Sequence, residues 1–415
     1  MQHIIIIVLL IYMGLYLINI APIISDRAKE SDFAHYYIAT DIYSSGTSPY
    51  SKNLAPLHEE YGFNKCPVKE RISPYPPFFF FIFKPFASLN ITYGFIAWLA
   101  LEILCLFYLL LLTKTLLKSK MPVKGWVIFS MVIIGSSWTI SHFFFSQVGL
   151  LLAALVLSAF ILNKKEKYAL ACVLISMAGM IKLFPFALLP WFIWRTKTSN
   201  WYRFKLLCIS LGSIIFIILI TGYTNWIDYY QISMQQQTSK SYGILFNFSL
   251  PSFLVNTVLI IKNFQLSPAW ASFCNYLALS SGILIIAISY IFCLYKNKNF
   301  DLEFCLLTVV MLLGNIRTFG HYFVFLIFPM AMAFVMAFSA NSLKKILWIS
   351  LIFIALNLHH LIFVWPAWLS PVPKLYMLYF LNYIPMLGLL GLLHFFYKAI
   401  SDSSFSSVKY IQAID

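Results

Sequence analysis

The sequence predicts an all-α polytopic membrane protein, a bundle of about twelve transmembrane helices with shorter re-entrant or surface helices on its outer face. Three observations predict this fold class. The 415 residues are 61% hydrophobic and only 10% charged, whereas soluble domains carry about a quarter charged residues. Stretches such as 95–112, 206–220 and 283–294 are nearly free of charge and suit a hydrocarbon layer about 30 Å thick. These runs are continuous and do not alternate, which favours helices over an outer-membrane barrel.

Lysine-rich loops predict the orientation of these helices. The formal net charge of +15 would suggest nucleic-acid binding in a soluble protein, but here the basic residues cluster between apolar runs, as in cytoplasmic loops. Such clusters occur at 114–124, 164–167, 195–205, 296–298 and 344–345. Placing them in the cytoplasm predicts cytoplasmic termini and spans at 3–20, 92–113, 125–141, 147–163, 168–181, 184–194, 206–222, 270–295, 302–316, 321–338, 346–363 and 376–397.

Some segments are not expected to cross the membrane in this simple way. The run 3–20 has no basic start and a longer apolar core than a signal peptide, so we expect an uncleaved first helix. Counting 76–89 or 249–261 as a span would reverse the next lysine-rich loop, so both are predicted as re-entrant or surface helices on the outer side. Residues 1–400 are expected to form one membrane domain, with 21–91 as its first extracytoplasmic loop and 401–415 as a cytoplasmic tail.

The first outer loop is the most acidic part of the chain. It holds seven of the 14 acids: Asp26, Glu30, Asp32, Asp41, Glu59, Glu60 and Glu70. Asp32 and Tyr36 are four residues apart, so on a helix they share a face. A carboxylate beside aromatic residues at the membrane surface can act as a general base. A helix-capping or solvated acid is the alternative, because exposed acids are common.

Several cations and amides are predicted on the same outer side. Lys182 lies among apolar residues, which makes it either a functional group at membrane depth or a lysine that snorkels to the interface. Arg317 and His321 are four apart and can both donate to phosphate oxygens, or can anchor the chain at the interface. Gln147 and Asn247 are neutral hydrogen-bonding candidates. We therefore expect one cavity to hold Asp32, Tyr75, Gln147, Lys182, Asn247, Arg317 and His321.

The sequence gives little support for a metal or a cofactor. Seven cysteines are scattered without metal-ligand spacing, most of them in apolar runs, where a free cysteine acts as a small hydrophobe. Glu30 and Asp32 alone make a poor divalent-cation cage. A divalent metal remains an alternative, but metal independence is the prediction.

Four stretches of the chain resemble a known family. They are Ser31-Asp32-Phe33 with Tyr36 and Pro49-Tyr50; Tyr75-Pro76-Pro77; Ser146-Gln147-Val148-Gly149 with Ile181-Lys182-Leu183-Phe184-Pro185; and Gly320-His321-Tyr322, with Asn247-Phe248-Ser249 as a looser element. In this order they resemble glycosyltransferase family 87, the polyprenyl-phosphate-mannose-dependent mannosyltransferases of the GT-C superfamily. The chain has Leu183 where the family usually has proline, and Gly320 where tryptophan is common.

The resemblance implies a GT-C-like bundle that moves a hexose, by default mannose, from a polyprenyl-phosphate donor to a lipid or glycan acceptor. It further implies a bacterial inner membrane, an extracytoplasmic site and an inverting reaction. In this interpretation Asp32 is the base, Arg317, His321 and Lys182 bind the donor phosphate, and Tyr36, Tyr75, Gln147 and Asn247 orient the substrates. The chain has no Rossmann glycine fingerprint, which fits a lipid-linked donor.

Three other functions remain open at this stage. A lipid or small-molecule transporter would also use intramembrane charges, but repeat symmetry and broken helices at matching positions are not evident in the sequence. A structural membrane protein would not require an acid near the outer ends of its helices. An oligosaccharide polymerase or ligase is a nearer alternative, which the long acidic first loop makes less favoured. The substitution Asp32→Ala separates an enzyme from the first two classes.

Overall fold

The computed structural model describes residues 28–51, 54–63, 73, 75–117, 121–238, 247–261, 267–296, 299–340, 342–358 and 371–401. In these ranges every regular element is a helix. The chain forms two compact units, Met1–Gln235 and Gln236–Asp415. The predicted first span at 3–20 and the predicted tail after residue 401 lie outside the described residues.

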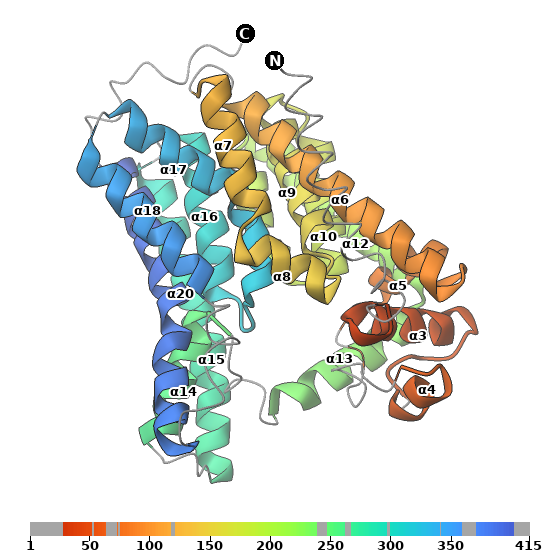
Figure 1. Cartoon of the computed structure of the whole chain (residues 1–415). Coiled ribbons are helices and arrows are strands. Elements are labelled where there is room, and N and C mark those ends of the chain that lie inside the picture. Colours follow the sequence, from red (N-terminus) through yellow and green to blue (C-terminus); the bar gives the residue numbers. More distant parts are fainter. Residues whose placement is uncertain are drawn as a thin grey trace. The chain divides into compact units, whose positions relative to one another are not determined.

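A row of four helices organises the first unit (Figure 1). In this row α6 (Ile91–Leu116), α9 (Gly149–Lys164), α10 (Tyr168–Ile181) and α12 (Asn200–Thr221) each pack on the next. The 26 residues of α6 give it a length of about 39 Å, more than the hydrocarbon layer needs. Side chains of Asn90 and Ser199 accept backbone N–H groups at the starts of α6 and α12, which satisfies donors that a helix start leaves open.

The helices α6 and α9 run parallel to each other. Trp98 Nε1 donates to the carbonyl of Ser146 at 3.1 Å near their starts, and the hydroxyls of Tyr108 and Ser158 lie 3.1 Å apart about ten residues further along both helices. The short turn at 165–167 then sends α10 back in the opposite direction. Lysine-rich loops therefore lie at one end of this row, and the starts of α6 and α9 lie at the other, as the predicted topology requires.

One predicted span is broken. The sequence predicts an uninterrupted helix over 125–141, but α7 (Val123–Ile134) and α8 (Ser137–Phe145) meet at an angle of 46°. Gly135 ends the first helix, and Ser136 caps the second, because its side chain accepts the backbone N–H of Thr139. Serine is a favoured residue at such a cap.

Short helices gather at the start of α6 (Figure 1). α3 (Asp32–Ser44) packs on α5 (Pro77–Ala87), which packs on α6, and α4 (Ala55–Glu60) contacts α3. With 11 residues, α5 is only about 17 Å long and too short to span a bilayer. Gly94 permits the close contact of α5 with α6, since a Cβ there would collide with the carbonyl oxygen of Phe86.

The remaining elements of the first unit are η2 (Phe184–Leu188), α11 (Leu189–Trp194) and α13 (Tyr223–Thr238). The sequence predicts one short span over 184–194, whereas the structure has a 3-10 turn followed by a six-residue helix. The α13 helix was not predicted. Six of the eight residues in its segment 231–238 are polar, so the helix offers no apolar run of the kind that identified the other helices.

The second unit is built around α16 (Phe300–Gly314), whose residues from Asp301 to Gly314 are all buried. Its neighbours along the chain are α14 (Leu250–Ile261), α15 (Pro268–Lys296), η3 (Gly320–Leu326), α17 (Ile327–Ser339), α18 (Leu343–Asn357) and α20 (Pro371–Ser401). The side chain of Asn299 caps α16 by accepting the N–H groups of Asp301 and Leu302. Two acids in the first turn of α16 also suit the positive end of its helix dipole.

Among the described residues, five helices are long and apolar enough to cross a membrane, or up to six if the bent pair α7–α8 is one span. Only 22% of the apolar window of α12, and the same share of that of α15, is buried inside the protein. Such apolar surface requires lipid around it. The prediction of an all-helical polytopic membrane protein is confirmed, while the count of twelve spans stays a prediction.

Candidate active site

Five of the predicted site residues meet in one hydrogen-bonded network in the first unit. The side-chain nitrogen of Gln147 donates a hydrogen bond to the Asp32 carboxylate. Its carbonyl oxygen accepts one from the Tyr75 hydroxyl, with 3.2 Å between the two oxygens. The Tyr75 hydroxyl also lies 2.7 Å from that of Tyr36, and Lys182 Nζ donates to it at 3.3 Å. These residues come from the start of α3, the residue before the Pro76-Pro77 pair, the turn between α8 and α9, and the end of α10.

The direction of each hydrogen bond in this network follows from the donor inventory. The Tyr75 hydroxyl has one proton and two lone pairs. It donates to the Gln147 carbonyl oxygen, so it accepts from both Tyr36 and Lys182. The Gln147 nitrogen can only donate, and the partner oxygen of Asp32 therefore accepts, as an ionised carboxylate does. An amide takes up no proton at ordinary pH, so the bridge does not relay protons between the lysine and the acid.

Burial differs along the network. The three neutral members are buried, with 0% of Tyr36, 5% of Tyr75 and 3% of Gln147 exposed. The two charged members, Asp32 and Lys182, are partly exposed. A buried neutral bridge thus holds an acid and a cation at its two accessible ends.

The turn that carries Gln147 is held from two sides. Ser146 adopts a left-handed backbone conformation, φ 55°, and ends α8. Its hydroxyl donates to the hydroxyl of Ser31, the residue that precedes α3, at 3.1 Å, and its carbonyl accepts from Trp98 of α6. Asp32 itself lies in the first turn of α3, where the helix dipole favours a negative charge.

An aromatic cluster supports the neutral bridge. The Tyr36 ring lies edge-on to Tyr75 at 4.9 Å and to Phe79 at 4.8 Å, and it also contacts Phe83 and Trp98. Each such pair contributes about 0.5–1.5 kcal/mol beyond its buried area. The Lys182 ammonium lies 4.8 Å from the centre of the Tyr75 ring, which adds a cation–π contact.

Two further tyrosines hold separate parts of the first loop together. Tyr50 donates to the backbone carbonyl of Tyr75 at 2.6 Å, and burial is the main cause that raises its pKa well above the usual value. Tyr61 donates to Asp41 at 2.6 Å, and this bond, followed by burial, raises the pKa of Tyr61 to about 12. Both phenols therefore remain hydrogen-bond donors at neutral and moderately alkaline pH.

The sequence-based prediction missed one buried acid–histidine pair beside this site. His142 Nε2 lies 2.8 Å from Glu102 Oε2, and the two side chains are 0% and 2% exposed. The backbone N–H groups of Leu150 and Leu151, in the first turn of α9, also interact with this carboxylate. The pair thus connects α6, α8 and the start of α9 around the turn that carries Gln147. An acid inside the apolar run 95–112 was the available signal, because such residues are functional candidates by default.

The other predicted residues lie in the second unit. The Asn247 amide donates to the carbonyl of Ile316 at 2.8 Å and accepts from the N–H of Thr318 at 2.8 Å. Its side chain therefore holds the backbone of the loop that carries Arg317. Asn315 also donates to the carbonyl of Arg317. Arg317 is partly exposed, and His321 is 8% exposed between the rings of Phe319 and Tyr322.

Within the part of the chain that the structure describes, no group of three or more His, Cys, Asp or Glu side chains could hold a metal ion. Metal independence stays a prediction.

The fold and the network together define the class of the protein. It is a helical integral membrane protein with an acid, a cation and a bridging amide held at one end of its apolar helices. Residues 74–316 match the model of glycosyltransferase family 87, more than half of the chain, and the chain belongs to this family. It is thus a glycosyltransferase, which acts on a sugar donor and an acceptor, and the family expected from the sequence is confirmed.

The matched region includes Tyr75, Gln147, Lys182 and Asn247, whereas Asp32, Tyr36, Arg317 and His321 lie outside it. No curated protein and no solved structure matches the chain.

Proposed function

We propose that this glycosyltransferase moves a hexose, with mannose as the first candidate, from a polyprenyl-phosphate donor to a lipid or glycan acceptor. The reaction is proposed for the extracytoplasmic face of a bacterial inner membrane, within a GT-C-type bundle. The observation that carries the proposal is the network in which Gln147 holds Asp32 and Tyr75 holds Lys182. It presents a carboxylate and a cation, the two groups that an inverting transfer from a sugar phosphate requires.

Asp32 is the proposed general base. A carboxylate has about four lone-pair sites, so the hydrogen bond from Gln147 leaves it the capacity to accept the proton of an acceptor hydroxyl. As that proton moves to Asp32, the hydroxyl oxygen forms a bond with the anomeric carbon. The bond between this carbon and the phosphate oxygen breaks, its electron pair stays on the phosphate, and the configuration at the carbon inverts.

Lys182 is the proposed partner of the phosphate in the first unit. Negative charge grows on the leaving phosphate during the reaction, and a fixed cation in a site of low dielectric constant stabilises it. Arg317 and His321 keep their predicted role as residues that bind the donor phosphate. These roles require that Lys182 stays charged, and its two contacts with Tyr75 are favourable to the charged ammonium.

The neutral residues of the network are proposed to position the two charged side chains. Tyr36, Tyr75 and Gln147 are buried and hydrogen-bonded to one another, which supports a role in holding Asp32 and Lys182 at a fixed separation. Asn247 has the corresponding role for the loop of Arg317. Preorganised charges of this kind cost no reorganisation during the reaction.

The experiment that tests this function compares donors. Purified protein in detergent is given radiolabelled polyprenyl-phospho-mannose, polyprenyl-phospho-glucose or GDP-mannose, together with a membrane lipid extract as acceptor. We expect transfer from a polyprenyl-phospho-sugar and none from the nucleotide sugar. Transfer from GDP-mannose alone would overturn the donor assignment, and a product with retained anomeric configuration would overturn the single displacement. Transfer only to a growing glycan chain would favour the polymerase or ligase alternative.

A further inference from the structure

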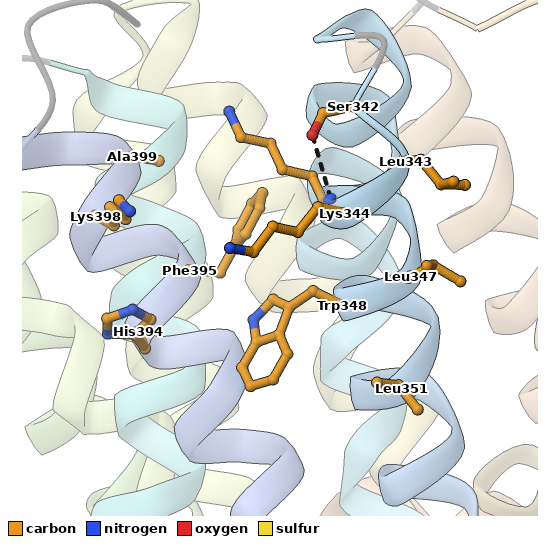
Figure 2. A pocket seen from close by; sticks show the side chains of 11 residues that line it. Ser342, Leu343, Lys344, Leu347, Trp348, Leu351, His394, Phe395, Lys398 and Ala399 are labelled. Carbon is orange, nitrogen blue, oxygen red and sulfur yellow. Dashed lines mark hydrogen bonds between the residues drawn. The ribbon is translucent and has the colours of Figure 1, made fainter.

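A cavity lies between α18 and α20 in the second unit, at the start of α18 and the end of α20 (Figure 2). Its volume is about 820 Å³, within the range of about 300–1,000 Å³ that is common for small-molecule sites. The lysines Lys344, Lys345 and Lys398 line it together with His394, Trp348 and Leu351. None of these residues belongs to the proposed transferase site.

The cavity opens where the two helices stop touching closely. A Cβ added to Gly388 would lie 3.0 Å from Leu356, and one added to Gly391 would lie 3.0 Å from Ile352. The small residues of α20 thus bring the helices together over this stretch. Beyond it, towards Lys398, α20 carries larger side chains, and the cavity is lined by this end of α20 and the start of α18.

The lining has one sign of charge. Three lysines and a histidine contribute to it, and none of the described residues that line it is acidic. His394 and Lys398 are four apart on α20, and Lys344 and Trp348 are four apart on α18, so each pair shares a helix face. Figure 2 shows the Lys344 and Lys398 side chains with His394 and Trp348 around this space. Such a set complements an anionic group.

Polarity changes along α18 in the order expected at a membrane surface. Lysines lie in its first turn, Trp348 follows one turn later, and Leu351 lies one turn deeper. Trp348 is 45% exposed, Leu347 55% and Leu351 58%. Basic residues at the headgroups, tryptophan at the interface and leucine in the acyl region form the usual sequence of side chains that contact a lipid.

This end is distinct from the end that carries Arg317 and His321. The candidate span Gly320–Ser339 separates His321 from the start of α18, and its 20 residues correspond to about 30 Å. The cavity is thus about one bilayer thickness from the proposed phosphate-binding loop. It also lies at the end with the lysine-rich sequence 344–345, which the predicted topology places in the cytoplasm.

We propose that this cavity binds one anionic phospholipid of the leaflet on the lysine-rich side of the protein. Lys344, Lys345 and Lys398 would contact the headgroup phosphate, and Trp348, Leu347 and Leu351 would contact the glycerol and an acyl chain. The site is separate from the transferase reaction and does not depend on the proposed donor or acceptor.

The test is native mass spectrometry of the full-length protein in detergent with added palmitoyl-oleoyl phosphatidylglycerol or phosphatidylcholine. Wild type is compared with the triple variant Lys344→Gln/Lys345→Gln/Lys398→Gln. A matched control, Lys164→Gln/Lys165→Gln/Lys167→Gln, removes the same charge from the loop between α9 and α10. We expect one preferred phosphatidylglycerol site in wild type and in the control, with affinity on the order of 100-fold lower in the triple variant, about fivefold per lysine.

Three results would overturn the proposal. Equal binding of the two lipids would show that the headgroup charge is not recognised. An equal loss in the control would show that the effect comes from net charge. Displacement of the lipid by excess inorganic phosphate would show a site for phosphate alone. If the triple variant does not yield folded protein, the single variants are used, and unchanged lipid affinity in all three would contradict the assignment.

Discussion

Gln147 donates a hydrogen bond from its side-chain amide to the carboxylate of Asp32, a residue 115 positions earlier in the chain. The carbonyl oxygen of the same amide accepts a hydrogen bond from the Tyr75 hydroxyl, and this hydroxyl accepts one from Lys182. One neutral side chain therefore determines where the proposed base lies and, through Tyr75, where the cation lies.

Gln147→Glu is expected to lower the transfer rate by about 10- to 150-fold, because it removes a hydrogen bond to a charged group, which contributes about 1.5–3 kcal/mol. It also places a second carboxylate beside Asp32. Transfer kinetics at saturating donor measure the effect. The control is Asn163→Asp, which changes another buried amide at the far end of α9, the helix that follows Gln147. A similar rate loss in the control would show that the effect is only loss of stability.

Tyr75→Phe and Lys182→Met are expected to be coupled. The Tyr75 hydroxyl acts by positioning Lys182. The rate losses of the two single variants, expressed as free energies and summed, should therefore be larger than the loss of the double variant. Contacting residues typically show coupling of about 0.5–3 kcal/mol. A double-mutant cycle of kcat/KM measures this. Tyr36→Phe, which removes one bond to the same hydroxyl, should cost less. Strict additivity would contradict the bridge.

Much of this arrangement could be predicted from the sequence. The positions of the lysine-rich loops place Asp32, Gln147 and Lys182 on one side of the membrane, and the structure brings these three residues into one network. The sequence did not indicate that Tyr75 and Gln147 would bond to each other, since this depends on packing between segments distant in the chain.

Other features could not be predicted for identifiable reasons. The break at Ser136 lies inside an apolar run whose hydropathy continues across it, so only the capping bond of Ser136 reveals it. Glu102 was visible as an acid, but its partner His142 is 40 residues away, and no local pattern connects them. The polar helix α13 lacks the apolar run on which the prediction of membrane helices depends.

The Glu102–His142 pair is expected to stabilise the fold around the turn of Gln147. Glu102→Leu or His142→Phe alone leaves a buried polar partner without its hydrogen bond, at a cost of about 1–3 kcal/mol. The double variant Glu102→Leu/His142→Phe should be more stable than either single variant. Thermal unfolding in detergent measures this, with the exposed Glu166→Gln as a control. Single variants as stable as wild type would contradict the assignment.

Asn247→Ala is expected to raise KM for the donor, as Arg317→Ala is. The substitution leaves the N–H of buried Thr318 without this partner, at a cost of about 1–3 kcal/mol, while the carbonyl of Ile316 keeps only the Ser249 hydroxyl. The loop of Arg317 should then lose its fixed position, and KM for the donor should rise in both variants. Asn256→Ala, another buried amide in the adjoining helix α14, serves as the control and should leave KM unchanged.

The central claim is that Asp32 is the base of a transfer from a lipid-linked sugar. The most direct measurement compares wild type with Asp32→Asn in single-turnover transfer from radiolabelled polyprenyl-phospho-mannose, with donor binding measured in parallel. Asp41→Asn, on the same helix α3, is the matched control. We predict a rate lower by about 10²–10⁴-fold in Asp32→Asn, with donor binding retained and the control close to wild type. Transfer at the wild-type rate by Asp32→Asn would contradict the claim.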